Sequence, residues 1–121
     1  MIDHTAVNVS DQDAARSFYS QALLPLGYSL AFEHEVFMGF ADSAGLSLGV
    51  VRRDPVGGAH VAFKCDDHAT VDAFYEAAMA AGGKDNGPPG IRAHYHENYY
   101  GAFVHDVDGN NIEAVCQAPQ S

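Results

Sequence analysis

The chain has 121 residues, of which 47% are apolar, and its six basic and sixteen acidic residues give a formal net charge of −10. This length suits one compact domain over residues 1–121. The acidic balance argues against nucleic acid and anionic membranes as partners, because both require a basic patch. No apolar run approaches the roughly 20 residues of a membrane span, and the N-terminus does not resemble a signal peptide. We therefore expect a cytoplasmic protein.

The sequence repeats itself at an offset of 56 residues. This offset aligns identical residues along a strand, a helix and a helix stop, namely His4 with His60, Ala6 with Ala62, Asp11 with Asp67, Phe18 with Phe74, Tyr19 with Tyr75, Ala22 with Ala78 and Gly27 with Gly83. Such a match predicts duplication of a unit of about 55–60 residues. The first module is expected over residues 1–56 and the second over residues 57–121.

The first module reads as β-α-β-β-β. Residues 2–9 alternate as a strand, with His4 on the face that a helix would leave uncovered. Ser10 or Asp11 is expected to cap a helix that ends near residue 24. Three strands separated by short polar turns are then expected over residues 29–35, 36–41 and 46–52.

The second module repeats this plan. A strand begins at His60, a helix is expected over residues 71–81, and the Gly- and Pro-containing residues 82–89 read as a loop. The remaining strands are expected over residues 93–96, 101–105 and 111–116. The predicted fold class is therefore α+β, built from two βαβββ modules.

Glu113 is the most unusual residue of the predicted strands. The turn at residues 108–110 should join two antiparallel strands, and alternation along the second places Glu113 on the uncovered face. His4 and His60 have the same parity, although each alone could be an ordinary hydrogen-bonded strand histidine. Two imidazoles and one carboxylate on one surface suit Fe(II), Mn(II), Ni(II), Co(II) or Zn(II), with positions left open for water or substrate.

Three segments carry a family resemblance: D-H-T-A-V-N-V-S-D at the start, H-V-A-F in the middle and D-V-D-G-N-N-I-E-A-V at the end. They resemble the vicinal oxygen chelate superfamily, which includes glyoxalase I, extradiol dioxygenases, fosfomycin-resistance thiol transferases and bleomycin-binding proteins. The resemblance implies an open, U-shaped eight-stranded mixed sheet around a metal-binding cleft, with His4, His60 and Glu113 at the ligand positions. It also implies a small oxygen-rich substrate, chelated through adjacent oxygens to a Lewis-acidic metal, and a homodimer.

One departure from the family concerns a fourth ligand. Glyoxalase I takes such a ligand from the last strand of the first module, and our sequence match places Leu48 opposite Glu113. Because leucine cannot bind a metal, the resemblance favours a three-residue ligand set like that of the dioxygenases and thiol transferases.

Further candidates lie in the second module. Alternation should point one of Tyr99 and Tyr100 into the concavity, where a phenol could act as an acid or base beside Glu113, although core packing is an alternative. His94 and His96 would share a strand face and form a weaker metal candidate. Arg92 contacts an anionic substrate or is simply exposed.

Two functions remain open from the sequence. The first is a metal-dependent lyase or isomerase, dioxygenase or thiol transferase that acts on a small molecule. The second is a metal-free module that sequesters a small molecule, as bleomycin-binding proteins do. Cys65 and Cys116 are expected to be buried, reduced thiols.

Overall fold

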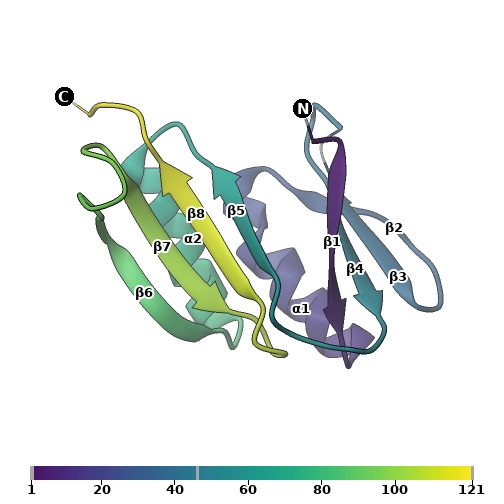
Figure 1. Cartoon of the computed structure of the whole chain (residues 1–121). Coiled ribbons are helices and arrows are strands. Elements are labelled where there is room, and N and C mark those ends of the chain that lie inside the picture. The colour runs from purple at the N-terminus through teal and green to yellow at the C-terminus, as the bar shows by residue number, and fades with distance from the viewer. Residues whose placement is uncertain (1, 46, 121) are drawn as a thin grey trace.

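The computed structural model describes residues 2–45 and 47–120 and confirms the two βαβββ modules (Figure 1). The first module contains β1 (His4–Val9), α1 (Gln12–Ala22), the short 3-10 helix η1 (Leu24–Leu26), β2 (Ser29–Glu33), β3 (Phe37–Ala41) and β4 (Ser47–Arg52). The second contains β5 (His60–Lys64), α2 (His68–Ala80), β6 (Lys84–Ile91), β7 (Tyr100–His105) and β8 (Asn111–Cys116). Leu46, the first residue of a predicted strand, lies outside the described residues.

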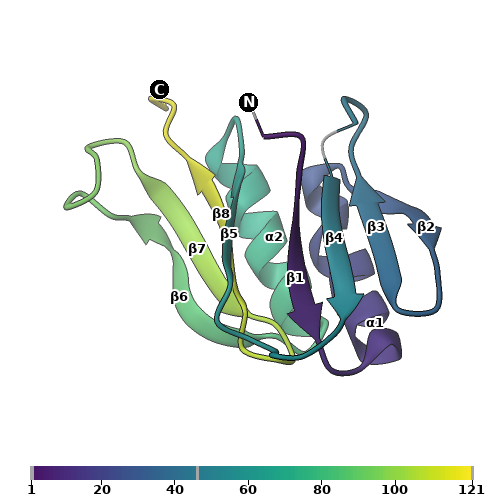
Figure 2. The ribbon, with the colours of Figure 1, turned by 45° about the vertical axis from the view of Figure 1, so that its right-hand side comes forward.

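Each module forms a four-stranded mixed sheet. The strand order is β1-β4-β3-β2 in the N-terminal sheet and β5-β8-β7-β6 in the C-terminal sheet, and in both the first strand runs parallel to the last. Both helices cover the same side of the two sheets (Figures 1 and 2). We call the other side, which no helix covers, the open face.

Aspartate caps set the start of both helices. The Asp11 carboxylate accepts a hydrogen bond from the Ala14 N–H at 3.0 Å, and Asp67 accepts one from the Thr70 N–H at 2.7 Å. These bonds satisfy backbone donors that the first helical turn leaves unpaired. Because Asp67 is the cap, α2 begins at His68, three residues before the start predicted from the sequence.

The prediction for the segment after α2 was wrong. Residues 84–91, expected largely as loop, form β6, whereas residues 93–96, expected as a strand, lie in the turn before β7. β6 is an edge strand with two register irregularities. Prolines at 88 and 89 are tolerated because the irregularity between Gly87 and Gly90 leaves these two positions out of the ladder with β7.

One hydrophobic core runs beneath both sheets. Phe18 of α1 and Phe74 of α2, which the repeat aligns, are both fully buried in it. Cys65 and Cys116 are free and buried, as expected. Among the described helices, none is long and apolar enough to span a membrane.

A buried polar network joins the two modules at one end. Asp106 accepts hydrogen bonds from the Tyr19 hydroxyl at 2.5 Å, from the Asn110 side chain at 2.8 Å and from the Asn110 N–H at 2.9 Å. The Asn110 side-chain amide also donates to the Asn8 carbonyl at 3.0 Å. The most family-specific segment of the sequence therefore has a structural role, since it fixes the last hairpin to the first module.

The neighbouring edges of the two sheets are β1 and β5, and they run in opposite directions (Figures 1 and 2). No ladder pairs these two strands with one another in the described structure. His4 is the first residue of β1 and His60 the first residue of β5. Because the strands are antiparallel, these repeat-equivalent histidines lie at opposite ends of the boundary between the modules.

Candidate functional site

A row of four residues crosses the open face of the C-terminal sheet. Strand pairing places Glu113 between Ala62 of β5 and Phe103 of β7, and Phe103 faces Gly87 of β6. Neighbours in such a row point to the same side of a sheet. Ile112 and Ala114 point to the helix side and are fully buried. The sequence prediction for the parity of Glu113 is therefore confirmed.

Glu113 is a buried carboxylate with two side-chain partners. It is 1% exposed, one of its oxygens lies 2.8 Å from His60 Nε2, and the other accepts a short hydrogen bond from the Tyr99 hydroxyl. Burying a charged carboxylate is costly unless it is hydrogen-bonded, and these two groups provide that stabilisation. The imidazole remains more than half exposed, with 55% of its side-chain surface accessible. The cluster therefore combines a buried carboxyl group with an imidazole whose edge is accessible.

Of the two candidate tyrosines, only Tyr99 reaches the open face. The Tyr100 hydroxyl donates to Asp72 of α2 at 2.6 Å, and its ring stacks on His68 at a centroid distance of 3.8 Å. Tyr100 therefore lies on the helix side of the sheet. For Tyr99, burial raises the pKa of the phenol well above its usual value, and the hydrogen bond to Glu113 raises it further. Tyr99 therefore remains protonated at neutral pH and acts as a hydrogen-bond donor.

Gly101 makes room for this contact. A Cβ atom at position 101 would lie 3.1 Å from the Tyr99 ring and 3.6 Å from a Glu113 carboxylate oxygen. The φ angle of this residue lies outside the left-handed region. Space rather than backbone conformation therefore explains glycine at this position.

His4 does not join His60 and Glu113 in the chain. Its Nδ1 lies 2.8 Å from the Asp3 carboxylate, and 68% of its side-chain surface is exposed. Within residues 2–45 and 47–120, no group of three His, Cys, Asp or Glu side chains is placed to hold a metal. The structure brings together two of the three predicted ligands.

The distance between His60 and Glu113 suits two adjacent ligands of one cation. Donor atoms that each lie about 2.1 Å from a metal at a right angle are separated by about 3 Å, close to the 2.8 Å between His60 Nε2 and Glu113 Oε1. The Tyr99 hydrogen bond to the second carboxylate oxygen is the kind of contact that orients a metal ligand. At His4, the Asp3 carboxylate holds Nδ1, so Nε2 is the ring nitrogen that could bind a metal. One chain therefore brings two candidate ligands together, while the third candidate, His4, lies elsewhere.

Comparison with known proteins places the chain in a family. The model of the glyoxalase/bleomycin resistance protein/dioxygenase superfamily matches residues 1–114. The chain belongs to this superfamily. No curated protein matches the chain significantly.

Solved structures of the superfamily share the whole fold. A glyoxalase/bleomycin resistance protein from Albidiferax ferrireducens T118 is 28% identical, with a TM-score of 0.84 over 98% of this chain and 99% of that one. A glyoxalase/bleomycin resistance protein/dioxygenase family enzyme from Burkholderia phytofirmans PsJN is 18% identical, with a TM-score of 0.74 over 96% of this chain and 98% of that one. The second likeness concerns the fold alone.

The strand register corrects one detail of the superfamily match. Ala6 pairs with Gly49, as Ala62 pairs with Glu113, so Gly49 and not Leu48 occupies the position equivalent to Glu113. Leu48 is 1% exposed and belongs to the hydrophobic core. The first module still offers no ligand at this position, because glycine has no side chain.

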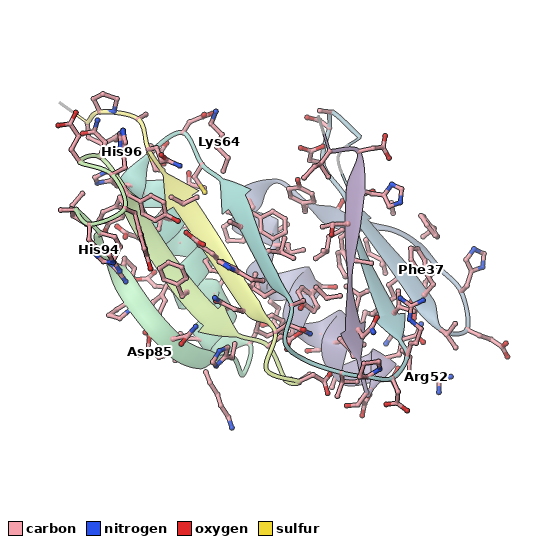
Figure 3. All side chains as sticks on the ribbon, viewed as in Figure 1. Phe37, Arg52, Lys64, Asp85, His94 and His96 are labelled. Carbon is pink, nitrogen blue, oxygen red and sulfur yellow. The ribbon has the colours of Figure 1, made fainter. Side chains whose placement is uncertain are left out.

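Among the described residues, the two other candidate histidines form no hydrogen bond or ring contact with His60 or Glu113, although the His94 ring packs on Tyr95, whose ring contacts Tyr99. His94 and His96 are in the loop between β6 and β7, at the side of the C-terminal sheet that is remote from β1 (Figure 3). The prediction that they share a strand face was wrong, because their segment forms a turn.

Sequence reasoning missed Phe103 and Gly101, and it left Arg92 undecided. The Arg92 guanidinium carbon lies 5.4 Å from the centre of the Phe103 ring, which in turn lies 6.4 Å from the His60 ring. Alternation along residues 101–105 indicates which side chains share the face of Glu113, provided that the pairing of β7 with β8 is known. A mid-strand glycine next to a predicted site residue was the available signal for Gly101.

Proposed function

We propose that this chain is a divalent-metal-dependent enzyme of the glyoxalase superfamily that acts on a small oxygen-rich molecule. The observation that carries the proposal is Glu113, a buried carboxylate whose two oxygens contact His60 and Tyr99 on the open face. A metal bound here by His60 and Glu113 would act as a Lewis acid toward adjacent substrate oxygens. Its identity among Fe, Mn, Ni, Co and Zn is left to experiment.

The residues of the chain have separate roles in this proposal. Glu113 binds the cation with one oxygen and is held in place by Tyr99 through the other. Tyr99 stays protonated, because burial and the neighbouring carboxylate raise the pKa of its phenol, and it can donate a hydrogen bond to a substrate oxygen when it turns from Glu113. Tyr100 is bound to Asp72 on the helix side, so we assign it no catalytic role.

We further propose that a second copy of the chain supplies the third ligand. His4 and His60 lie at opposite ends of antiparallel edge strands, and His4 projects an exposed imidazole whose Nδ1 is held by Asp3. A twofold-symmetric dimer has two equivalent sites, and each site can combine residues from both copies. His4 of one copy would then meet His60 and Glu113 of the other.

Metal content of purified protein tests the ligand set. After incubation with Zn(II), Ni(II) or Mn(II) and dialysis, wild-type protein should retain about one ion per chain, and His60→Ala and Glu113→Gln should lower affinity by about a hundredfold or more. His34→Ala is the matched control, because it removes an exposed imidazole from the turn between β2 and β3 in the first module. Equal metal retention by wild type, H60A and E113Q would overturn the proposal.

Mixing two defective chains tests whether the site is shared. A dimer of one His4→Ala chain and one Glu113→Gln chain contains one site with all three native ligands and one site that lacks two. Random pairing of equal amounts should therefore restore about a quarter of the wild-type metal content. If H4A loses no metal, or if mixing restores none, His4 is not a ligand in trans.

A metal-free binding protein is the second candidate, and the N-terminal sheet favours it. Phe32 and Phe37 stack at a centroid distance of 5.3 Å, and Phe32 is 48% exposed. An accessible aromatic pair can hold a planar ligand without a metal. Retention of small-molecule binding by protein that holds no metal, with or without His60, would favour this function.

A further inference from the structure

Arg92 lies directly opposite Tyr99, one residue beyond the end of β6. The Arg92 N–H donates to the Tyr99 carbonyl at 2.7 Å, so the two residues form a cross-strand pair at the base of the loop before β7. Cross-strand neighbours point to the same face of a sheet, and the Tyr99 hydroxyl reaches Glu113 on the open face. The Arg92 guanidinium therefore lies beside the candidate centre.

The guanidinium is held in place by uncharged groups. Its two terminal nitrogens donate to the carbonyls of Gly90 and Pro88, both at 2.8 Å, and its carbon lies over the Phe103 ring. A Cβ atom at Gly87 or at Gly90 would lie 3.1 Å from a guanidinium nitrogen. The edge strand thus provides space for this side chain and fixes its direction.

The positive charge of Arg92 has no acidic partner among the described residues. The contrast is Arg16 of α1, which hydrogen-bonds both Glu33 and Asp13. Of the five N–H groups that a guanidinium carries, Arg92 uses two for carbonyls. Acidic residues outnumber basic ones in this chain by sixteen to six, yet none of them pairs with Arg92 among the described residues. Its remaining N–H groups, beside His60 and Glu113, are available to an anionic ligand.

We propose that Arg92 binds a carboxylate of the substrate. Guanidinium forks match the planar geometry of carboxylates, and a hydrogen bond between two charged groups is roughly twice as strong as a neutral one. This inference rests on the proposed function, because it assumes that the substrate sits over His60 and Glu113. It names the substrate class: a small molecule with two adjacent oxygens for the metal and a separate carboxylate for Arg92.

A matched pair of probes tests this inference. 3,4-Dihydroxybenzoate and 3,4-dihydroxybenzamide both carry adjacent oxygens, but only the benzoate carries a carboxylate. Their affinities are measured by calorimetric titration of Zn(II)-loaded and of EDTA-treated protein. Wild-type Zn(II)-loaded protein should bind the benzoate about tenfold more tightly than the benzamide.

The variants separate the carboxylate contact from general effects. Arg92→Gln should weaken benzoate binding about tenfold and leave benzamide binding unchanged, and Arg92→Lys should recover part of the preference. Arg52→Gln is the control for net charge, because Arg52 lies on the N-terminal sheet, far from β6 (Figure 3). It should leave both affinities unchanged.

The outcomes distinguish this inference from the proposed function. A preference for the benzoate that persists in R92Q, an equal loss for both probes, or no binding of either probe to protein that retains Zn(II) would each overturn the carboxylate role. Failure of wild-type protein to retain any of Zn(II), Ni(II) and Mn(II) would overturn the metal-dependent function instead.

Discussion

The two modules share one scaffold but have different open faces. In the N-terminal sheet, the row equivalent to that of Glu113 reads Ala6, Gly49, Gly39 and Phe32, from β1 through β4 and β3 to β2. In the C-terminal sheet, it reads Ala62, Glu113, Phe103 and Gly87, from β5 through β8 and β7 to β6. The alanine is shared, but each of the other three positions has glycine in one module and a larger side chain in the other.

Aromatic rings fill the space that the N-terminal row leaves. A Cβ atom at Gly39 would lie 2.6 Å from the Phe32 ring, and one at Gly49 would lie 2.9 Å from the Phe37 ring. Phe37 pairs with Val51 as Gly101 pairs with Val115, so it occupies the place of Gly101. Where the first module has a ring, the second has the gap through which Tyr99 reaches Glu113. The ring of Phe37 therefore fills the open face of the first module, whereas Gly101 leaves room for a polar cluster in the second.

The turns that join the last two strands of each module differ in the same way. Asp42 accepts from the Ala44 N–H at 3.0 Å, and Asp106 accepts from the Asp108 N–H at 2.9 Å, each followed by a glycine with a φ of 85°. Only Asp106 is buried and also bound to Tyr19 of the other module. The same local turn thus occurs in both modules, and in the second module its aspartate also joins the two modules through Tyr19.

The largest expected effect comes from removing that anchor. Asp106→Ala leaves buried donors of Tyr19 and Asn110 without an acceptor, so we expect the free energy of unfolding to fall by about 3–4 kcal/mol. The matched variant Asp42→Ala should cost less, because Asp42 is only half-buried. Urea denaturation followed by circular dichroism measures both.

A milder variant keeps this prediction testable if D106A does not fold. Tyr19→Phe removes one hydrogen bond and retains the ring, so it should cost about 1–2 kcal/mol. Equal losses for D106A and D42A would show that the two turns are equivalent and that the modules are not joined through Asp106.

An intermediate effect is expected at the two open-face glycines. Gly101→Ala brings a methyl group against the Tyr99 ring, so the variant should lose about 1–2 kcal/mol and the pKa of the Tyr99 phenol should fall toward its usual value. Gly49→Ala should cost less than about 1 kcal/mol, because the half-buried Phe37 ring can turn toward solvent. NMR titration of tyrosines labelled at Cζ follows the phenol. An unchanged Tyr99 titration in G101A would contradict the role of the gap.

Repeats, periodicity and turn residues were sufficient to predict both modules and the face of Glu113. They could not place His4 relative to His60, because the repeat fixes equivalent positions and not the direction in which the two copies pack. Antiparallel packing of β1 and β5 separates residues that a parallel arrangement would bring together. The edge strand β6 was missed because prolines and glycines predict loops, although an irregular edge strand tolerates them. Arg92 could not be assigned from sequence, since its position depends on that strand.

The smallest effects should appear at the two ends of the pH range, because each module anchors its helix differently. Hydrogen bonds from Arg16 of α1 lower the pKa of Glu33, whereas a hydrogen bond to Asp72 of α2, together with burial, raises the pKa of Tyr100 to about 12. The Glu33 contribution is present above its unfolded pKa of about 4.3 and is lost as pH falls through the lower folded pKa.

The Tyr100 contribution has the opposite sign. It is fully present below the unfolded pKa of about 10 and is lost as pH rises to about 12. Tyr100→Phe should therefore lose about 1 kcal/mol at neutral pH and flatten the alkaline limb of the unfolding free energy, while Glu33→Gln should flatten only the acid limb. Urea midpoints between pH 3 and pH 12 measure both limbs. If either variant changed both limbs, the two helices would not be held by these separate contacts, and the asymmetry between the modules would be confined to their open faces and turns.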